Sequence, residues 1–406
     1  MSDDAHSKRW RILGILGLAE LLGMSLWFAA SAVAPQLRFL WSLTTIEASW
    51  LTTIVQLGFV AGTAVAAILN LADLIPAKRL FAVSAVLGGI ANAAVLAAPG
   101  FKTALILRFL TGFCLAGVYP PAMKMISTWF RSRRGLAIGV IVGALTVGKA
   151  VPYLVRSLPH MRVKEVILTS SLGALLAAML VGIGYREGPF PFTSRPFSWH
   201  HVSDVVRVKE WRLATASYLG HMFELYAFWT WIPAYLAASV AVNAGRYRAP
   251  RFVSLLAFTT IAIGGLGCVW GGLFADNKGR ERLVTISLAL SGTCCVLSAV
   301  LFGGPLWVLG ALAMTWGFFV IADSAQFSTL VTEAVPPHAV GTALTVQTSL
   351  GFLLTMLPMQ IVPWIAELVG WRWAFAVLSV GPAFGIAAIR QLSELRRGAP
   401  EALSST

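Results

Sequence analysis

The stretch that decides the fold runs from Arg108 to Pro152, RFLTGFCLAGVYPPAMKMISTWFRSRRGLAIGVIVGALTVGKAVP. It consists of two apolar, glycine-rich segments joined by a short basic turn. Three cations lie within or at the edges of the apolar segments, namely Arg108, Lys124 and Lys149. A charged side chain at bilayer depth costs roughly 2.5–3.5 kcal/mol and usually faces a cavity or a partner. The stretch therefore predicts two neighbouring transmembrane helices beside a positively charged pocket.

The rest of the chain repeats this apolar pattern. Of its 406 residues, 57% are hydrophobic and 12% are charged, which excludes an ordinary soluble domain. The net charge of +14 does not indicate a nucleic-acid partner, because the basic residues fall in short turns between apolar runs. The four cysteines lie in apolar segments without metal-ligand spacing. We therefore expect no nucleic acid, no metal and no cofactor.

The apolar runs predict an all-α membrane protein with twelve transmembrane helices, because most of them are about twenty residues or slightly longer. The polar N-terminus leads into the first run without a small-residue cleavage site, so we expect that span to be retained. The expected spans are 12–34, 47–71, 80–98, 103–127, 135–157, 166–185, 212–238, 252–275, 283–303, 307–331, 339–363 and 371–391.

Charge predicts the orientation of these spans. Most of the 31 lysine and arginine residues fall in the tails and loops on the side of the N-terminus. Cytoplasmic loops of membrane proteins carry an excess of such residues. We therefore expect a multi-pass protein of a bacterial inner membrane with both termini in the cytoplasm.

The two halves of the chain repeat each other. Glu20 precedes Trp27 at the spacing by which Glu224 precedes Trp231. The motif Gly-x-Ala-Ile-x-Val in span five returns in span eleven with leucine in place of isoleucine.

The repeat predicts the domain organisation. The segment between spans six and seven is rich in proline and charge, which is typical of a linker. We expect a six-helix bundle at 1–185, a cytoplasmic linker at 186–211 and a second six-helix bundle at 212–406. Transporters built from two such halves bind substrate near the membrane midplane between them.

The sequence resembles the major facilitator superfamily over essentially its full length. The motif Gly272-Leu-Phe-Ala-Asp276-Asn-Lys278-Gly279-Arg280 is similar to the family's loop motif, and the copy around Asp73 is degenerate. Arg108-Phe-Leu-Thr-Gly112 resembles the family's motif in the fourth span. The resemblance implies two pseudo-symmetric six-helix bundles and a gating role for Asp73, Asp276 and Arg280.

The branch of the family is indicated by further residues. Ala116-Gly-x-Tyr119-Pro120 is similar to branches that carry organic anions. Gly143-Ala144 stands where drug/proton antiporters carry Gly-Pro, and the Gly/Asn-rich signature of nitrate/nitrite porters is absent from spans five and eleven. Organic anions are therefore the first expectation.

The predicted substrate ligands are Arg108, Lys149, Tyr119, Gln347 and Trp231. Lys149 is the sharpest candidate, because its repeat partner is Thr355 and the fold does not require a cation there. The alternatives are that Arg108 binds backbone carbonyls of a neighbouring helix and that Lys149 pairs with Glu20 or Glu224. The alternative for Trp231 is ordinary packing or an anchor at the membrane interface.

Buried carboxylates are the predicted proton carriers. Glu20 and Glu224 lie within spans, and His221 precedes Glu224 by about one helical turn. The alternative is a set of helix-bundle hydrogen bonds. Asp323 and Lys124 are assigned to gating. One alternative is that Lys124 extends its charged group to the membrane interface, and another is that Asp323 pairs with Lys124.

These patterns and the family resemblance predict a secondary active transporter, and by analogy with similar proteins we expect a monomer. We expect it to move a small anionic solute, a carboxylate, by alternating access with proton symport. The chain shows no nucleotide fingerprint and no hydrolase constellation, so we do not expect an enzyme. The alternatives are efflux of amphipathic compounds by proton antiport, transport of a metal or metal chelate through His221, Glu224 and Asp323, and a non-transporting receptor.

Overall fold

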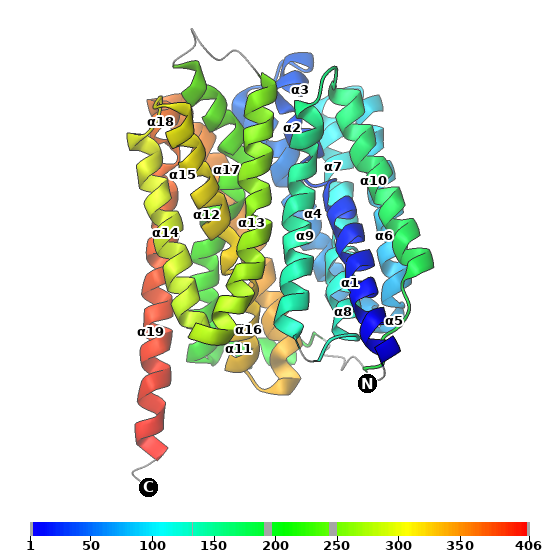
Figure 1. Ribbon diagram of the computed structural model, residues 1–406, viewed down its shortest axis with the longest axis vertical. Helices are drawn as coiled ribbons and strands as arrows, with labels where there is room; N and C mark the ends of the chain where they lie inside the picture. The colour runs from blue at the N-terminus through cyan, green and yellow to red at the C-terminus, as the bar shows by residue number, and fades with distance from the viewer. Residues whose placement is uncertain (1–2, 132, 191–196, 243–249, 404–406) are drawn as a thin grey trace.

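The computed structural model describes residues 3–131, 133–190, 197–242 and 250–403, and these residues form helices and no strands. Ten of the expected spans meet the length and apolarity of a membrane-crossing helix. The more polar helices α1 (Asp3–Met24) and α12 (Lys209–Ala241) stand in the same bundle (Figure 1). With them, the described residues supply the twelve expected crossings.

The first half of the chain runs from α1 to α10. Its further elements are α2 (Ala29–Ala32), α3 (Ala34–Leu40), α4 (Thr45–Ile68), α5 (Leu71–Leu74), α6 (Ala77–Ala94), η1 (Val95–Ala97), α7 (Phe101–Leu115), α8 (Tyr119–Ser127), α9 (Arg134–Ser157) and α10 (Val163–Gly184).

The second half follows the short helix α11 (His200–Arg207). After α12 come α13 (Pro250–Lys278), α14 (Arg280–Val300), α15 (Leu306–Ala322), α16 (Ser324–Ala334), η2 (Pro337–Ala339), α17 (Val340–Val369), α18 (Trp371–Ala374), η3 (Ala376–Ser379) and α19 (Val380–Leu403). Helix α19 continues past the span expected to end at residue 391.

Several of the expected spans are interrupted, among them the twelfth at Phe375. The first breaks between Met24 and Ala29, the fourth between Leu115 and Tyr119, and the tenth at Asp323. The breaks in the fourth and tenth spans lie at corresponding places in the two halves. A broken helix frees backbone carbonyls, which need new donors where no water is present. Buried polar side chains that can donate hydrogen bonds are therefore expected beside these breaks.

Helices α9 and α13 join the two halves through glycines. A side chain on Gly143 would come within 2.9 Å of the Gly265 carbonyl oxygen, so the backbones are nearly in contact. Helices α4 and α17 form the second junction between the halves. In Figure 1 the first-half helices lie on one side and the second-half helices on the other, with α9 beside α13.

Both chain ends lie at one end of the bundle, which we call the terminal end; the other is the far end (Figure 1). Polar bonds cross between α4 and α17: Ser49 and Thr53 each bond the amide of Gln360. The Thr45 end of α4 and the Val369 end of α17 lie at the far end, so these bonds join the two halves toward that end.

Candidate functional site

Lys149 lies among aromatic rings contributed by both halves. Its Nζ is 4.1 Å from the ring centre of Trp27, 4.6 Å from Tyr226 and 5.2 Å from Trp229. It also donates a hydrogen bond of 2.5 Å to the Tyr226 hydroxyl, and the side chain is only 1% exposed. Each cation–π contact stabilises an ammonium ion by about 0.5–2 kcal/mol. Because these contacts replace only part of the lost hydration, the charge still attracts an anion.

Three hydrogen-bond donors near Lys149 have no partner within the described residues. They are the indole nitrogens of Trp27 and Trp229 and the hydroxyl of Tyr153. Tyr153 lies one turn after Lys149 on α9 and packs beside Phe28. Buried polar groups are nearly always hydrogen-bonded in proteins. An ammonium ion surrounded by unused donors is chemically suited to a carboxylate.

Glu20 lies beside this ammonium ion on α1. Gly148 packs against the backbone of Leu21, which brings α1 directly alongside α9. Glu20 is fully buried and within electrostatic reach of Lys149. Neither of its carboxylate oxygens has a hydrogen-bond donor among the described residues. The site therefore holds a buried cation, Lys149, beside a buried carboxyl group, Glu20, whose two oxygens accept no hydrogen bond from the described residues.

Arg108 donates hydrogen bonds to the main-chain carbonyls at the break in the first span. Its Nη1 donates to the carbonyl of Leu26 at 3.0 Å and its Nη2 to that of Trp27 at 2.5 Å. Its Nε donates to Leu51 on α4 at 3.1 Å, and Nη1 also donates to Asn92 at 2.9 Å. This geometry matches the structural alternative, in which the arginine bonds backbone carbonyls of neighbouring helices. Arg108 and Lys149 still both contact the same residue, Trp27.

Glu224 faces away from Lys149, into the second half. Its carboxylate accepts hydrogen bonds from Trp316 Nε1 at 2.6 Å, Ser291 Oγ at 2.8 Å and Cys295 Sγ at 3.2 Å. All four side chains are buried. Glu224 is thus the centre of a satisfied hydrogen-bond set between α12, α14 and α15, which is the alternative kept open from the sequence.

His221 and Asp323 form a separate buried pair. His221 Nδ1 lies 3.0 Å from Asp323 Oδ1, and both side chains are at most 1% exposed. Asp323 stands at the break of the tenth span. Glu224 bonds a different set of side chains, and the described part of the chain holds no group of three or more His, Cys, Asp or Glu residues suited to a metal ion. The trio proposed for the metal alternative therefore does not assemble.

The structure also places the other three predicted substrate ligands, Trp231, Gln347 and Tyr119. Trp231 Nε1 donates to the carbonyl of Met359 at 2.8 Å, a carbonyl whose helical partner would be Pro363. Gln347 is 2% exposed and its amide nitrogen has no partner among the described residues. Tyr119 begins α8 and is within electrostatic reach of Glu20.

Asp276 lies where α13 meets the start of α9. A side chain placed on Gly135 would lie 3.3 Å from the Asp276 carboxylate. Gly135 is in the first turn of α9, whose N-terminal N–H groups attract an anion. The carboxylate thus lies beside the N-terminus of α9, across the junction of the two halves.

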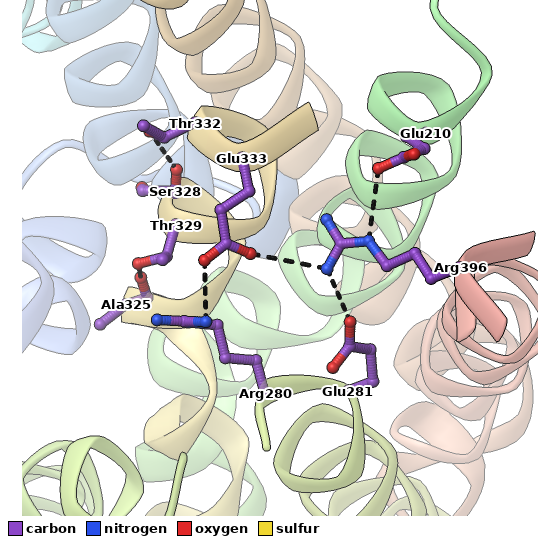
Figure 2. A network of polar contacts seen from close by, with 9 residues as sticks. All are labelled: Glu210, Arg280, Glu281, Ala325, Ser328, Thr329, Thr332, Glu333 and Arg396. Carbon is purple, nitrogen blue, oxygen red and sulfur yellow. Dashed lines mark hydrogen bonds and ion pairs between the residues drawn. The ribbon is translucent and has the colours of Figure 1, made fainter. Parts of the chain in front are cut away.

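Arg280 belongs to an ion network at the terminal end (Figure 2). Its Nη1 lies 2.8 Å from Glu333, on α16. Arg396 binds three carboxylates, Glu281 at 2.7 Å, Glu210 at 3.3 Å and Glu333 at 3.5 Å. The network joins α12, α14, α16 and α19 within the second half.

Two predicted gate residues remain. The side chain of Asp73 lies outside the described residues, although its backbone belongs to α5. Lys124 is half-buried near the end of α8.

Sequence reasoning missed several members of these sets. Tyr153 carried a usable signal, since it follows Lys149 by four residues. Asn92, Glu333 and Arg396 carried no comparable signal, because their partners are distant in the chain and only packing brings them together.

The family model of the Major Facilitator Superfamily matches residues 15–359, which is most of the chain. The chain belongs to this superfamily. Its members are transporters, so the protein is a multi-pass membrane transporter of the superfamily and not an enzyme.

The superfamily relatives matched are distant. A hexuronate transporter of Escherichia coli (strain K12) is 22% identical, covering 93% of this chain and 92% of the relative. A niacin transporter of Acinetobacter baylyi is 25% identical, covering 73% and 74%. Among solved structures, an inward-facing, unoccupied bacterial homologue of the human lysosomal transporter Spinster superposes with a TM-score of 0.71 at 15% identity, covering 95% and 98%. This last likeness supports the superfamily fold alone.

Proposed function

We propose that the protein transports a small organic anion, and that Lys149 binds the carboxylate of that substrate. The observation that carries the proposal is a buried ammonium ion with one hydrogen bond and three unused donors around it. The hexuronate and niacin transporters among the relatives carry solutes with a carboxylate group, which supports the same chemistry.

The proposed cycle is alternating access between two bundles, residues 1–185 and 212–406. Lys149 is almost completely covered, so a substrate reaches it only when the halves separate at one end. We assign the far-end closure to the Ser49 and Thr53 bonds with Gln360, and the terminal-end closure to Asp276 at α9. Arg280, Lys124, Asp73 and Asp323 belong to the proposed gating set.

The proposed coupling ion is a proton, and Glu20 is its first candidate carrier. With no substrate bound, ionised Glu20 balances the charge of Lys149. A substrate carboxylate on Lys149 takes over that role, and a second negative charge in the same dry site is then disfavoured. Glu20 therefore takes up a proton as the anion binds, which makes import a proton symport. His221 and Glu224 are the rival carriers in the second half.

The other predicted ligands take secondary places in this proposal. Gln347 has an unused amide for a polar group of the substrate, and Tyr119 lies near Glu20. Arg108 holds the backbone of Trp27, so it supports the site, and Trp231 supports α17. We place the terminal end in the cytoplasm of a bacterial cell and propose a monomer.

Uptake into proteoliposomes tests this function. Vesicles carrying the protein are loaded at neutral pH and diluted into acidic buffer with labelled glucuronate or nicotinate. We expect accumulation that follows the imposed pH gradient and collapses with a protonophore. Lys149→Ala should abolish it, and Lys102→Ala, an exposed lysine on α7, is the matched control. Equal uptake by the wild type and Lys149→Ala would contradict the site assignment.

A further inference from the structure

Helix α9 carries three hydrogen-bond donors on one face. Lys149, Tyr153 and Arg156 follow one another at separations of one helical turn, so their side chains lie above one another along the helix. At about 1.5 Å of rise per residue, Lys149 and Arg156 are roughly 10 Å apart along the helix axis. Since α9 ends at the far end, the three side chains form a row from the buried site toward the surface there.

The middle donor of this row is unused. Tyr153 is 2% exposed, and its hydroxyl has no hydrogen-bond partner among the described residues. Its ring centre lies 6.3 Å from that of Phe28, which in turn lies 6.4 Å from the Trp229 ring that contacts Lys149. A buried hydroxyl without a partner is destabilising. In this position it can donate to an anion that moves between Lys149 and the far end.

Arg156 stands at the outer end of the row, where its side chain is half-buried. Its Nη1 donates to the carbonyl of Met161 at 3.1 Å, and its Nε lies 3.0 Å from the side-chain amide of Gln36 on α3. With the amide oxygen of Gln36 turned toward it, the guanidinium donates to that oxygen through Nε and Nη2. Among the described contacts, one N–H on each terminal nitrogen is left. A carboxylate can bind a guanidinium through two such N–H groups.

The surface around Arg156 is positively charged. Besides Arg156, exposed cations lie on several of the described helix ends there, namely Arg38, Lys102, Arg162, Lys164, Arg251 and Arg372. The carboxylates at this end are those of Glu47, Glu165 and Glu367. Two of them accept the backbone N–H at the start of their own helices. An excess of one sign of charge around an opening raises the local concentration of ions of the other sign.

Arg156 is also accessible in a state in which Lys149 is not. Arg156 is half-buried, whereas Lys149 is only 1% exposed. An anion can therefore bind at Arg156 before the two halves separate. When they separate at the far end, the Tyr153 hydroxyl offers it a hydrogen bond on the way to Lys149.

We propose that Arg156 forms a second anion site at the far-end mouth of the transporter, and that a substrate carboxylate passes from Arg156 by way of Tyr153 to Lys149. This inference rests on the proposed function, since it gives the entry route to the same Lys149 site. It adds a site for a carboxylate and the end of the molecule from which that carboxylate arrives.

Uptake kinetics in right-side-out membrane vesicles test the route. Initial rates for labelled glucuronate and nicotinate are measured under an imposed pH gradient, at low and high salt. We expect Arg156→Gln to lower kcat/KM by roughly tenfold at low salt and to change kcat little, because it slows capture and leaves Lys149 in place. The difference from the wild type should shrink as salt screens the charge.

Lys164→Gln is the matched control, since it removes one exposed cation from the same end and lies on α10, outside the row. Its kcat/KM should stay within about twofold of the wild type. A loss in Lys164→Gln as large as that in Arg156→Gln would assign the effect to the net charge of the far end and overturn Arg156 as a site.

Two further variants separate capture from a structural role. Arg156→Lys keeps the charge and loses the fork that reaches both Met161 and Gln36, so it should recover most of kcat/KM although its melting temperature falls as in Arg156→Gln. Tyr153→Phe removes a hydroxyl without a partner, so kcat/KM should fall while the melting temperature stays equal or rises. Arg156→Lys as slow as Arg156→Gln, with both equally destabilised, would make Arg156 a structural residue and overturn the route.

The remaining outcomes distinguish this inference from the function on which it rests. Equal kcat/KM for Arg156→Gln and the wild type at low salt, with Lys149→Ala inactive, would overturn the entry route and leave the Lys149 site standing. Absence of uptake of both acids by the wild type would overturn the proposed function and the entry route with it.

Discussion

The guanidinium group of Arg108 donates to the main-chain carbonyl of Trp27, whose indole ring lies against the ammonium ion of Lys149. A buried arginine therefore fixes the backbone of the residue whose ring covers Lys149, the lysine that we propose binds the substrate. The break in the first span makes this possible, because it frees the Leu26 and Trp27 carbonyls.

Replacing Arg108 should destabilise the protein strongly. Arg108→Ala leaves buried carbonyls without donors, and each costs about 1–3 kcal/mol. We expect a large fall in the melting temperature in detergent, together with loss of anion binding. Lys102→Ala on the same helix is the control and should change stability by less than about 0.5 kcal/mol. A stable Arg108→Ala protein that has lost only binding would instead assign Arg108 to the substrate.

The bond between Trp231 and Met359 predicts a specific energetic coupling. Pro363 cannot donate to the Met359 carbonyl, and the indole N–H takes its place. Trp231→Phe should cost about 1 kcal/mol in the wild type. In the Pro363→Ala background the restored backbone N–H should remove most of that cost.

A double-mutant cycle measured by thermal unfolding checks this coupling. Additive effects would show that the indole does not replace the missing helical bond. A fall in substrate affinity of similar size in both backgrounds would instead make Trp231 a ligand.

Glu20 and Glu224 should respond differently to amide substitution. Glu20→Gln imitates the protonated carboxyl group, so it should still bind the anion and should lose the dependence of uptake on the pH gradient. In the proposed cycle the wild type needs a protonated Glu20 to hold the anion. Its affinity for the anion should therefore rise as the pH falls, and the affinity of the variant should not. Anion titrations across pH, and counterflow with no gradient, measure both properties.

Glu224→Gln should act on stability instead. The amide group brings a donor against Trp316, Ser291 or Cys295, which all donate to the native carboxylate. We expect a loss of about 1–3 kcal/mol with coupling retained. Loss of coupling in Glu224→Gln, with Glu20→Gln still driven by the gradient, would move the proton site to the second half.

The ion network in Figure 2 predicts a salt-dependent loss. Arg396→Ala removes the partner of Glu210 and Glu281 and leaves three neighbouring carboxylates with only Arg280. These groups are partly exposed, so we expect a cost of about 1 kcal/mol that shrinks as salt screens the repulsion.

Arg397→Ala is the matched control for this network. Arg397 is adjacent in sequence and bonds only Ser393 among the contacts described, so its loss should have little effect. Equal melting temperatures for the two variants at low salt would contradict a stabilising network.

The sequence was sufficient for the helices and for the family. Apolar runs of membrane length, basic turns and the motif around Asp276 are local patterns. They predicted twelve spans, ten of which meet the length and apolarity of a membrane-crossing helix among the described residues. The same local pattern selected Lys149, because a charged side chain inside a glycine-rich apolar run is costly unless it faces a cavity or a partner in the bundle interior.

Which partner each buried polar residue has was decided only by the tertiary structure. From the sequence, Arg108 and Lys149 were both candidate substrate ligands, and Glu20 and Glu224 were both candidate proton carriers. In the fold, Arg108 donates to the carbonyls of a broken helix, whereas Lys149 lies against aromatic rings. The fold gave Glu224 three hydrogen-bond donors and, within the described residues, gave Glu20 none. The physical reason is that helix periodicity fixes which face a residue occupies, whereas its hydrogen-bond partners come from helices distant in the chain, through close packing at glycines and through helix breaks.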